Sequence, residues 1–165
     1  MPDPADVNRR LIVRFYEAFD RGDGDTMAAC YAPEATFQDP VFGTLDGREA
    51  GEMWRFLTRR APRLDVDLLD HDADDSTGRA RWRARYEFSA TGRPVVNDVQ
   101  ARFAFRGGLI VDHVDSFSFF SWARQALGLR GLAVGWSPMG RSMVRRRARA
   151  DLHRSLRREG PGGGA

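Results

Sequence analysis

Between residues 63 and 117 the hydrophobic pattern has a period of two, and no other feature constrains the fold of this chain as strongly. Apolar and charged side chains alternate in four successive segments, which short stretches of turn-forming residues separate. Such alternation is typical of antiparallel strands that have one covered and one solvated face. We predict strands over residues 63–72, 79–90, 94–108 and 110–117.

Helical patterns come before these strands. The first helix is expected over about Val7–Asp20, with Asp6 as its N-cap, because apolar residues recur there at every fourth position. A short second helix is expected to have Asp25 as its cap, and a third is expected to end at Pro62. Helices followed by strands predict an α+β domain. The expected segments are helices over 7–20, 25–32 and 47–62, and a short extended piece over 35–40.

The last strand carries two ionisable residues on the face that should be buried. His113 and Asp115 are two residues apart and therefore point to the same side of a strand. A histidine beside an aspartate is a general acid/base pair, but a buried histidine is also often held in place by an aspartate as a structural partner. Both interpretations stay open. The row predicted to face the core is Leu109, Val111, His113, Asp115, Phe117 and Phe119.

The composition fits one well-buried domain, with 165 residues and 42% hydrophobic side chains. The one cysteine, Cys30, has no partner for an internal disulfide, and no run approaches eighteen apolar residues. The first ten residues lack the apolar segment of a secretory signal, so we expect a cytoplasmic protein. The three histidines are scattered and no phosphate loop or dinucleotide fingerprint occurs, so we expect neither a metal nor a cofactor.

Charge is divided unevenly along the chain. All 26 basic residues are arginine: residues 1–119 hold 16 of them against 21 acidic residues, whereas residues 120–165 hold 10 against 2. We predict a domain over residues 1–119, an Arg-rich helical extension over 120–159 and a disordered glycine-rich tail over 160–165. Helices are expected in the extension over about 120–127 and 138–158, with glycines between them.

Three interpretations of the extension remain open. In the first, its apolar residues pack on the domain or on a dimer partner, and the arginines form a solvated face. In the second, tryptophan, leucine and arginine attach residues 120–158 peripherally to an anionic membrane. The third, contact with nucleic acid, is the weakest, because no RNA-binding motif supports it. The apolar residues concerned are Trp122, Leu127, Leu132, Val134 and Trp136.

Residues Asn8 to Gly43 resemble the opening of SnoaL-like and ketosteroid-isomerase-like proteins, in the nuclear-transport-factor-2-like superfamily. The resemblance implies a cone, in which a strongly curved, mainly antiparallel sheet wraps three helices and leaves an apolar pocket open at one end. The family includes isomerases, polyketide cyclases, epoxide hydrolases, dehydratases and plain binding or dimerisation modules, so the fold alone does not decide the chemistry. The likeness is carried by Gly22-Asp23, Tyr31-Ala32, Glu34-Ala35, Phe37-x-Asp39-Pro40 and the final Ile-Val-Asp-His-Val-Asp at 110–115.

The resemblance assigns a role to Asp39. In ketosteroid isomerases the aspartate of this Asp-Pro pair is the base that moves a proton beside a carbonyl, although an aspartate before proline also caps turns. Those isomerases bind the oxyanion with a helix-one tyrosine and a strand carboxylic acid. The matching positions are Phe15 and Ala101, and Tyr16 lies one residue further on. We therefore do not expect steroid isomerisation by that mechanism.

SnoaL-type cyclases similarly place a histidine and an aspartate in the pocket, which implies this role for His113 and Asp115. We predict binding of a small apolar or aromatic molecule, with cofactor-independent proton transfer of the isomerase, cyclase or epoxide-hydrolase kind. The alternative is a non-catalytic binding or dimerisation scaffold for the Arg-rich extension. A homodimer through the outer sheet face is also expected. The residues expected around the ligand are Phe15, Tyr16, Trp54, Trp82, Tyr86, Asn97, Ala101 and Phe117.

Overall fold

The computed structural model describes residues 1–61 and 63–158. The predicted stop at Pro62 and the predicted tail over 160–165 lie outside these residues. The helices are α1 (Pro4–Asp20), α2 (Gly24–Ala29), α3 (Gly47–Arg60), α4 (Phe119–Leu127), α5 (Leu129–Trp136) and α6 (Pro138–Arg158). The strands are β1 (Tyr31–Asp39), β2 (Gly43–Asp46), β3 (Asp65–Ala73), β4 (Thr77–Phe88), β5 (Arg93–Arg106) and β6 (Leu109–Ser116).

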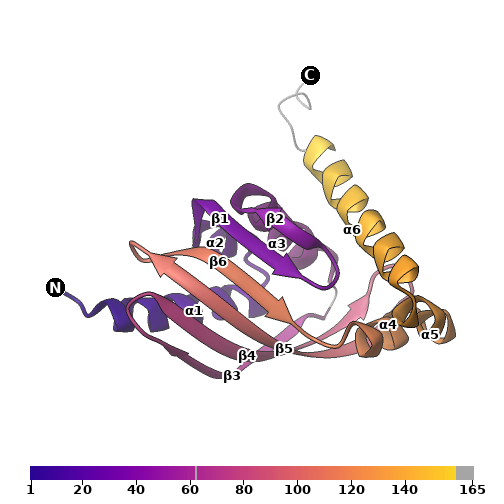
Figure 1. The fold of residues 1–165 in the computed structure, drawn as a ribbon, viewed down its shortest axis with the longest axis horizontal. Helices are drawn as coiled ribbons and strands as arrows, with labels where there is room; N and C mark the ends of the chain where they lie inside the picture. Colours follow the sequence, from indigo (N-terminus) through magenta and orange to yellow (C-terminus); the bar gives the residue numbers. More distant parts are fainter. Residues whose placement is uncertain (62, 159–165) are drawn as a thin grey trace.

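All six strands belong to one sheet, in the order β2-β1-β6-β5-β4-β3 (Figure 1). Every neighbouring pair is antiparallel except β1 and β6, which run parallel. The predicted α+β fold with a mainly antiparallel sheet is thus confirmed. Because β1 and β6 are neighbours inside the sheet, residues far apart in the sequence meet there.

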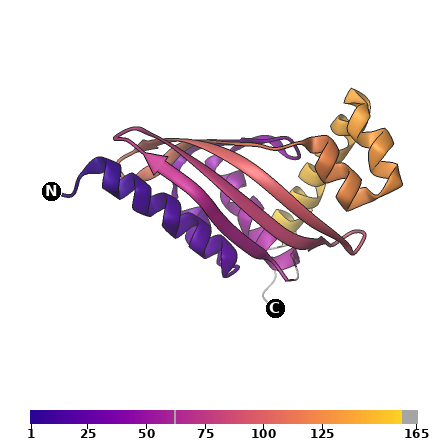
Figure 2. The ribbon, with the colours of Figure 1, turned by 90° about the horizontal axis from the view of Figure 1, so that it is seen from below.

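The sheet curves beside the N-terminal helices (Figures 1 and 2). α1 packs on β3 and β4, α2 packs on α1 and α3, and α3 packs on β1. Large side chains from both layers are fully buried between them, among them Phe15 and Tyr16 of α1, Phe37 of β1 and Met53 of α3. The hydrophobic core therefore lies between the helices and one face of the sheet.

The first two helices begin earlier than predicted, because other aspartates cap them. Asp3, and not Asp6, accepts a backbone N–H at the start of α1, with an N···O distance of 3.2 Å. Asp23, and not Asp25, does the same at the start of α2, at 2.9 Å. Each actual cap lies four residues before the first apolar residue of its helix pattern, Val7 or Met27, so the hydrophobic pattern alone does not indicate it.

The first strand is longer than the predicted extended piece. β1 includes Tyr31 and Ala32, which the pattern assigned to the second helix, and the hairpin strand β2 was not predicted. β2 is four residues long, too short for a period-two pattern to stand out. Its first residue, Gly43, pairs with Asp39 and has a φ of +73°, a conformation that favours glycine in the turn.

A register shift between β5 and β6 changes which residues of β6 face the core. Ile110 is fully buried, whereas Leu109 and Val111 are only partly buried, so the predicted inward row is wrong at those two positions. Beyond the shift, His113 and Asp115 point inward as predicted, with exposed fractions of 0% and 5%. The shift is what lets an apolar residue and the ionisable pair share one face.

The extension forms three helices rather than two. α5 occupies the glycine-rich stretch that was expected to be a connection. A Cβ atom at Gly131 would lie 2.0 Å from the carbonyl oxygen of Ala123, and one at Gly135 would lie 3.0 Å from the ring of Phe120. These glycines thus serve close packing of α5 on α4, at the end of the molecule opposite the N-terminus (Figures 1 and 2).

Packing of the extension on the domain is only partly as predicted. Trp122 is 5% exposed, and Leu127 and Val134 pack partly buried against the core. Leu132 and Trp136 are 40% and 83% exposed, so these two residues do not pack on the domain, and their packing on a dimer partner stays a prediction. Among the residues that the structure describes, no helix is long and apolar enough to span a membrane.

Candidate functional site

Asp39 lies at the end of β1, where the chain turns into β2. Its Oδ1 atom accepts the backbone N–H groups of Val41 and Phe42, at 2.9 Å and 2.5 Å. Its Oδ2 atom has no hydrogen-bond partner in the described part of the chain. The two interpretations of Asp39 are therefore compatible, because one oxygen caps the turn and the other is available to a ligand.

The surroundings of Asp39 favour its neutral form. The residue is half-buried, but its carboxyl group is largely removed from water, and this desolvation raises its pKa to about 7. The negative charge of Asp115 also raises this pKa, whereas the two backbone N–H groups and the charge of Arg145 on α6 lower it. A carboxyl group with such a pKa gains and loses a proton near neutral pH, as a general base requires.

A line of hydrogen bonds crosses the core from α3 to β6. The indole N–H of Trp54 donates to Tyr31 Oη at 2.8 Å. Tyr31 Oη lies 2.7 Å from His113 Nδ1, and His113 Nε2 lies 2.8 Å from Asp115 Oδ1. Because Tyr31 accepts from Trp54, its own hydrogen is free to go to Nδ1, and Nε2 then carries the hydrogen donated to Asp115. This arrangement satisfies every member of the line.

His113 is enclosed on all sides. Its side chain is fully buried, and the rings of Phe15, Phe37 and Phe103 surround it with centroid distances of 4.4–5.6 Å. Both ring nitrogens are occupied, so neither is free to exchange a proton with a ligand in this arrangement. The geometry favours the structural interpretation of His113, in which it fixes the position of Asp115.

Two buried polar groups lack any hydrogen-bond partner in the part of the chain that the structure describes. They are Tyr16 Oη and Trp82 Nε1, on residues that are 2% and 5% exposed and whose rings lie 5.5 Å apart. Burial raises the pKa of Tyr16 well above its usual value, and the nearby charge of Asp115 adds to this. An unpaired buried donor costs about 1–3 kcal/mol, so such a pair in a core calls for an explanation, such as a bound ligand.

The remaining predicted residues lie at different depths. Ala101 is buried and is the register partner of Asp115 across β5 and β6. Tyr86 is half-buried and accepts the indole N–H of Trp122 from α4 at 2.9 Å. Asn97 and Phe117 are only partly buried. The structure thus gathers Phe15, Tyr16, Trp54 and Ala101 around or beside the His113–Asp115 pair and places Trp82 against Tyr16. It leaves Tyr86, Asn97 and Phe117 nearer the surface.

Three participating residues were not predicted as site residues. Tyr31 stands in the family motif, but the sequence pattern assigned it to the second helix, and only the pairing of β1 with β6 brings it beside that strand. Trp122 was assigned only to packing. Arg145 lies close to Gly43, since a Cβ atom built at Gly43 would be 2.9 Å from its Cδ. It is one of many arginines in α6, and nothing in the sequence distinguishes it.

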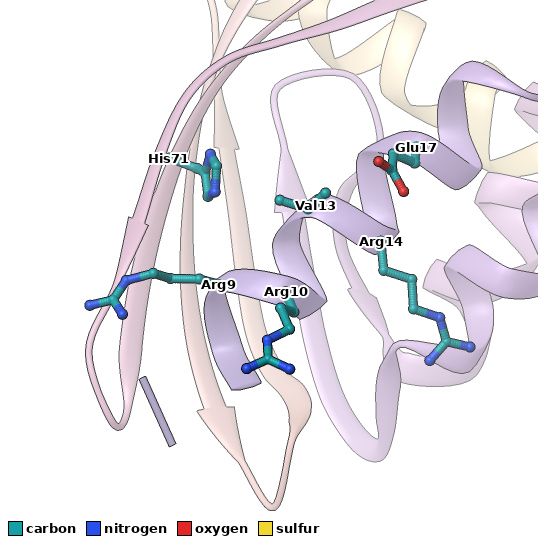
Figure 3. Close-up of a pocket in the computed structure, with 6 residues that line it drawn as sticks. All are labelled: Arg9, Arg10, Val13, Arg14, Glu17 and His71. Carbon is teal, nitrogen blue, oxygen red and sulfur yellow. The ribbon is translucent and has the colours of Figure 1, made fainter. Parts of the chain in front are cut away.

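A surface hollow of about 250 Å³ lies between α1 and β3 (Figure 3). None of the predicted site residues lines it, and one of its three arginines, Arg9, forms salt bridges with Asp6 and Asp72. Within residues 1–61 and 63–158, no group of three or more His, Cys, Asp or Glu side chains could hold a metal ion. The residues that line the hollow are Arg9, Arg10, Val13, Arg14, Glu17 and His71.

Solved structures of other proteins share this fold. One is a protein with a ketosteroid isomerase-like fold from Catenulispora acidiphila, solved in complex with trimethylamine; the TM-score is 0.65 at 17% identity, covering 78% of this chain and 97% of that one. A candidate polyketide cyclase from Xanthomonas campestris pv. campestris has a TM-score of 0.66 at 21% identity, covering 75% of this chain and 99% of that one. An LEH-like epoxide hydrolase from M. tuberculosis has a TM-score of 0.64 at 20% identity, covering 79% of this chain and 95% of that one. At such identities the likeness shows the fold alone.

No curated protein matches this chain in sequence. The model of one protein family does match it, over residues 12–113, and that family is described as the SnoaL-like domain. The matched range begins in α1 and ends at His113, so it takes in most of α1, all of α2, α3 and β1 to β5, and the first part of β6. The chain belongs to the SnoaL-like domain family.

Proposed function

We propose that the interior of the cone binds a small apolar molecule carrying an oxygen acceptor, such as a carbonyl or an epoxide, and that Asp39 moves a proton on it without a cofactor. The observation that carries this proposal is the pair of unpartnered buried donors, Tyr16 Oη and Trp82 Nε1. A ligand oxygen that accepts from one or both would satisfy groups that the folded chain leaves unpaired. The aromatic side chains around them suit an apolar or planar ligand body.

The division of labour follows from the hydrogen bonds. Asp39 has one oxygen fixed by the turn and one without a partner, so it is the proposed catalytic base. Tyr16 and Trp82 are the proposed donors, and they would stabilise negative charge that develops on the ligand oxygen. His113 is a positioning residue, because it contacts Tyr31 and Asp115 and has no nitrogen left for a ligand.

Two names among the structural neighbours agree with this chemistry. An epoxide hydrolase and a candidate polyketide cyclase share the fold. Both names describe reactions at an activated carbon or an epoxide, in which a carboxylate and a hydrogen-bond donor to oxygen are useful partners. They support the class of reaction proposed for this chain.

Proton exchange tests the proposal directly. A planar ketone that stabilises the protein is incubated with it in D₂O, and deuterium uptake beside the carbonyl is followed by NMR. We expect exchange that depends on the protein and that falls by about 10²–10⁴-fold in Asp39→Asn, the size of a general-base contribution. The variant should remain folded and bind the ketone, because the amide oxygen preserves the turn contacts. Exchange that is absent, or unchanged in the variant, would contradict the catalytic role.

A non-catalytic scaffold is the second candidate. It is favoured by the exposed apolar face of α5 and by the dense packing of aromatic rings around His113. A scaffold would tolerate Asp39→Asn and His113→Gln without loss of function in the cell, provided that both variants fold, and would depend on residues 138–158.

A further inference from the structure

We propose that the outward faces of α5 and of the first half of α6 form a docking surface for an anionic lipid bilayer. This inference does not depend on the proposed chemistry of the cone. It concerns a surface defined by Leu129, Leu132, Trp136, Met139 and Met143.

α5 has its two buried glycines inside and three of its large apolar residues outside. Gly131 and Gly135 face α4, where a Cβ atom would collide with Ala123 or Phe120. At 100° per residue, Leu129, Leu132 and Trp136 fall within about 60° of one another, on a different side of the helix from the two glycines, and they are 86%, 40% and 83% exposed. An ordinary surface helix has the reverse arrangement, with its apolar stripe toward the core. α5 therefore presents an apolar ridge to its surroundings.

α6 follows directly after α5, packs against it, and also exposes large apolar residues. Its inward side is formed by Val144, Ala148, Leu152 and Leu156, which pack against the core. Met139 and Met143 lie on the other side and are 72% and 59% exposed. Of the eight large hydrophobic residues exposed in the described chain, five lie between positions 129 and 143. The other three, Met1, Leu69 and Val96, are scattered. Concentration of this kind marks an interaction surface.

The charge around the ridge identifies the partner. Residues 120–158 contain ten arginines and one acidic residue, Asp151. On the helical wheel of α6, Arg146, Arg154 and Arg157 lie on the same side as the two methionines. A helix that lies in a membrane interface has this arrangement: its apolar and aromatic side chains sit at the level of the headgroups, and its arginines reach the phosphates.

Two other occupants fit less well. A second copy docked on the same face would bring two arginine-rich helices together, and their like charges would repel. A nucleic acid would use the arginines but would leave Leu129, Leu132 and the methionines exposed to water. An anionic bilayer is the partner that covers the apolar ridge and compensates the charge at the same time.

The fluorescence of the protein gives a direct readout. Trp54, Trp82 and Trp122 are 3–5% exposed, whereas Trp136 is 83% exposed, so a change on adding vesicles reports mainly on Trp136. The full chain is mixed with vesicles of phosphatidylcholine and phosphatidylglycerol, or of phosphatidylcholine alone, and binding is measured by co-sedimentation. We expect binding and a blue shift with the anionic vesicles, weakening as salt is added, and little of either with the neutral ones.

Matched variants separate the apolar ridge from charge alone. Leu129→Ser with Trp136→Ser should weaken vesicle binding by about tenfold or more, since both lose interfacial contact. Leu69→Ser with Val96→Ser removes exposed apolar residues elsewhere and should leave binding unchanged. Arg146→Gln with Arg157→Gln should weaken it, while Arg48→Gln with Arg102→Gln on the domain should not. Circular dichroism verifies that each variant is folded.

Three results would overturn the proposal. The first is no binding to anionic vesicles even at low salt. The second is binding that the Leu129 and Trp136 variant does not change, which would assign it to non-specific charge. The third is a dimer in solution that the same variant dissociates, which would assign the ridge to a second copy of the chain.

Discussion

At the scale of single residues, the interior contains satisfied and unsatisfied polar groups side by side. Tyr31 and Tyr16 are both buried tyrosines that contact the ring of Phe15. Tyr31 takes part in two hydrogen bonds, and Tyr16 Oη has no partner in the described residues. A fold does not need the second kind of hydroxyl for its stability, so this contrast separates groups that hold the fold from groups available to a ligand.

This contrast predicts opposite effects of the same substitution. Tyr31→Phe leaves Trp54 Nε1 and His113 Nδ1 unpaired and should lower the free energy of unfolding by about 1–3 kcal/mol. Tyr16→Phe removes a group that is already unpaired, so it should leave the stability of the free protein unchanged or raise it. Urea denaturation of both variants measures the difference. Equal losses in the two variants would show that Tyr16 has a partner after all.

Asp39 predicts a pH dependence of stability. Its pKa in the folded state, about 7, is above the ordinary value of 3.8, so the folded state holds this proton more tightly than the unfolded chain does. The stabilisation that comes from this tighter proton binding by Asp39 is complete below about pH 4 and is lost as the pH rises to about 7. Asp39→Asn has no such loss.

The free energy of unfolding of Asp39→Asn should therefore match that of the wild type near pH 4 and exceed it at pH 8. The gain has an upper bound of about 4 kcal/mol, which corresponds to moving the pKa from 3.8 to about 7. Chemical denaturation at several pH values follows the gap between the two proteins. A gap that stays constant from pH 4 to pH 8 would mean that the carboxyl group of Asp39 is well solvated.

At the scale of elements, much of the fold could be predicted from the sequence. The period-two pattern is strong in β4 and β5, and the capping pair Asp46 and Glu49 marks the start of α3. The hairpin strand β2, the shift in β6 and helix α5 could not be predicted. Each depends on a neighbouring element rather than on its own hydrophobic pattern: β2 on its pairing with β1, the shift on β5, and α5 on the surface of α4.

At the glycines of α5 we predict a change in stability opposite in sign to the one that helix propensity alone would give. Alanine is favoured over glycine by about 1 kcal/mol inside a helix. In Gly131→Ala, however, the new Cβ would lie 2.0 Å from the carbonyl oxygen of Ala123. We expect a net loss of about 1–3 kcal/mol from overpacking, measured by thermal denaturation. Leu132→Ala, on the exposed side of the same helix, should change stability by no more than about 0.5 kcal/mol. A stabilised Gly131→Ala would show that α5 does not pack closely on α4.

At the scale of the whole molecule, the extension reaches back to the domain. Arg59 of α3 donates to Ser155 of α6 at 3.2 Å, and Arg145 packs on Gly43, beside the turn that holds Asp39. The sequence predicts the extension and its charge, but not this contact, because ten arginines in one segment look alike until the fold brings one of them to the site. The strand period correctly places His113 and Asp115 on the buried face, whereas the roles of Asp39, His113 and Asp115 in a site stay predictions.

The contact predicts that α6 tunes the proposed base. The charge of Arg145 lowers the pKa of Asp39, so Arg145→Gln should raise that pKa further. Arg146→Gln, a neighbouring substitution on the outward side of α6, should leave it unchanged. An NMR titration of the Asp39 carboxyl carbon in the three proteins distinguishes them. The same titration curve in all three would place Arg145 too far from the site to matter.

The most direct test of the central claim, that the cone holds a ligand through its unpaired donors, is a thermal-shift measurement. The wild type and Tyr16→Phe are screened against planar ketones, phenols and small terpenoid epoxides. A ligand at a hundred times its dissociation constant should stabilise the wild type by about 2.7 kcal/mol, and Tyr16→Phe should lose most of this gain while staying as stable on its own. No shift with any compound, or an equal shift in both proteins, would contradict the claim.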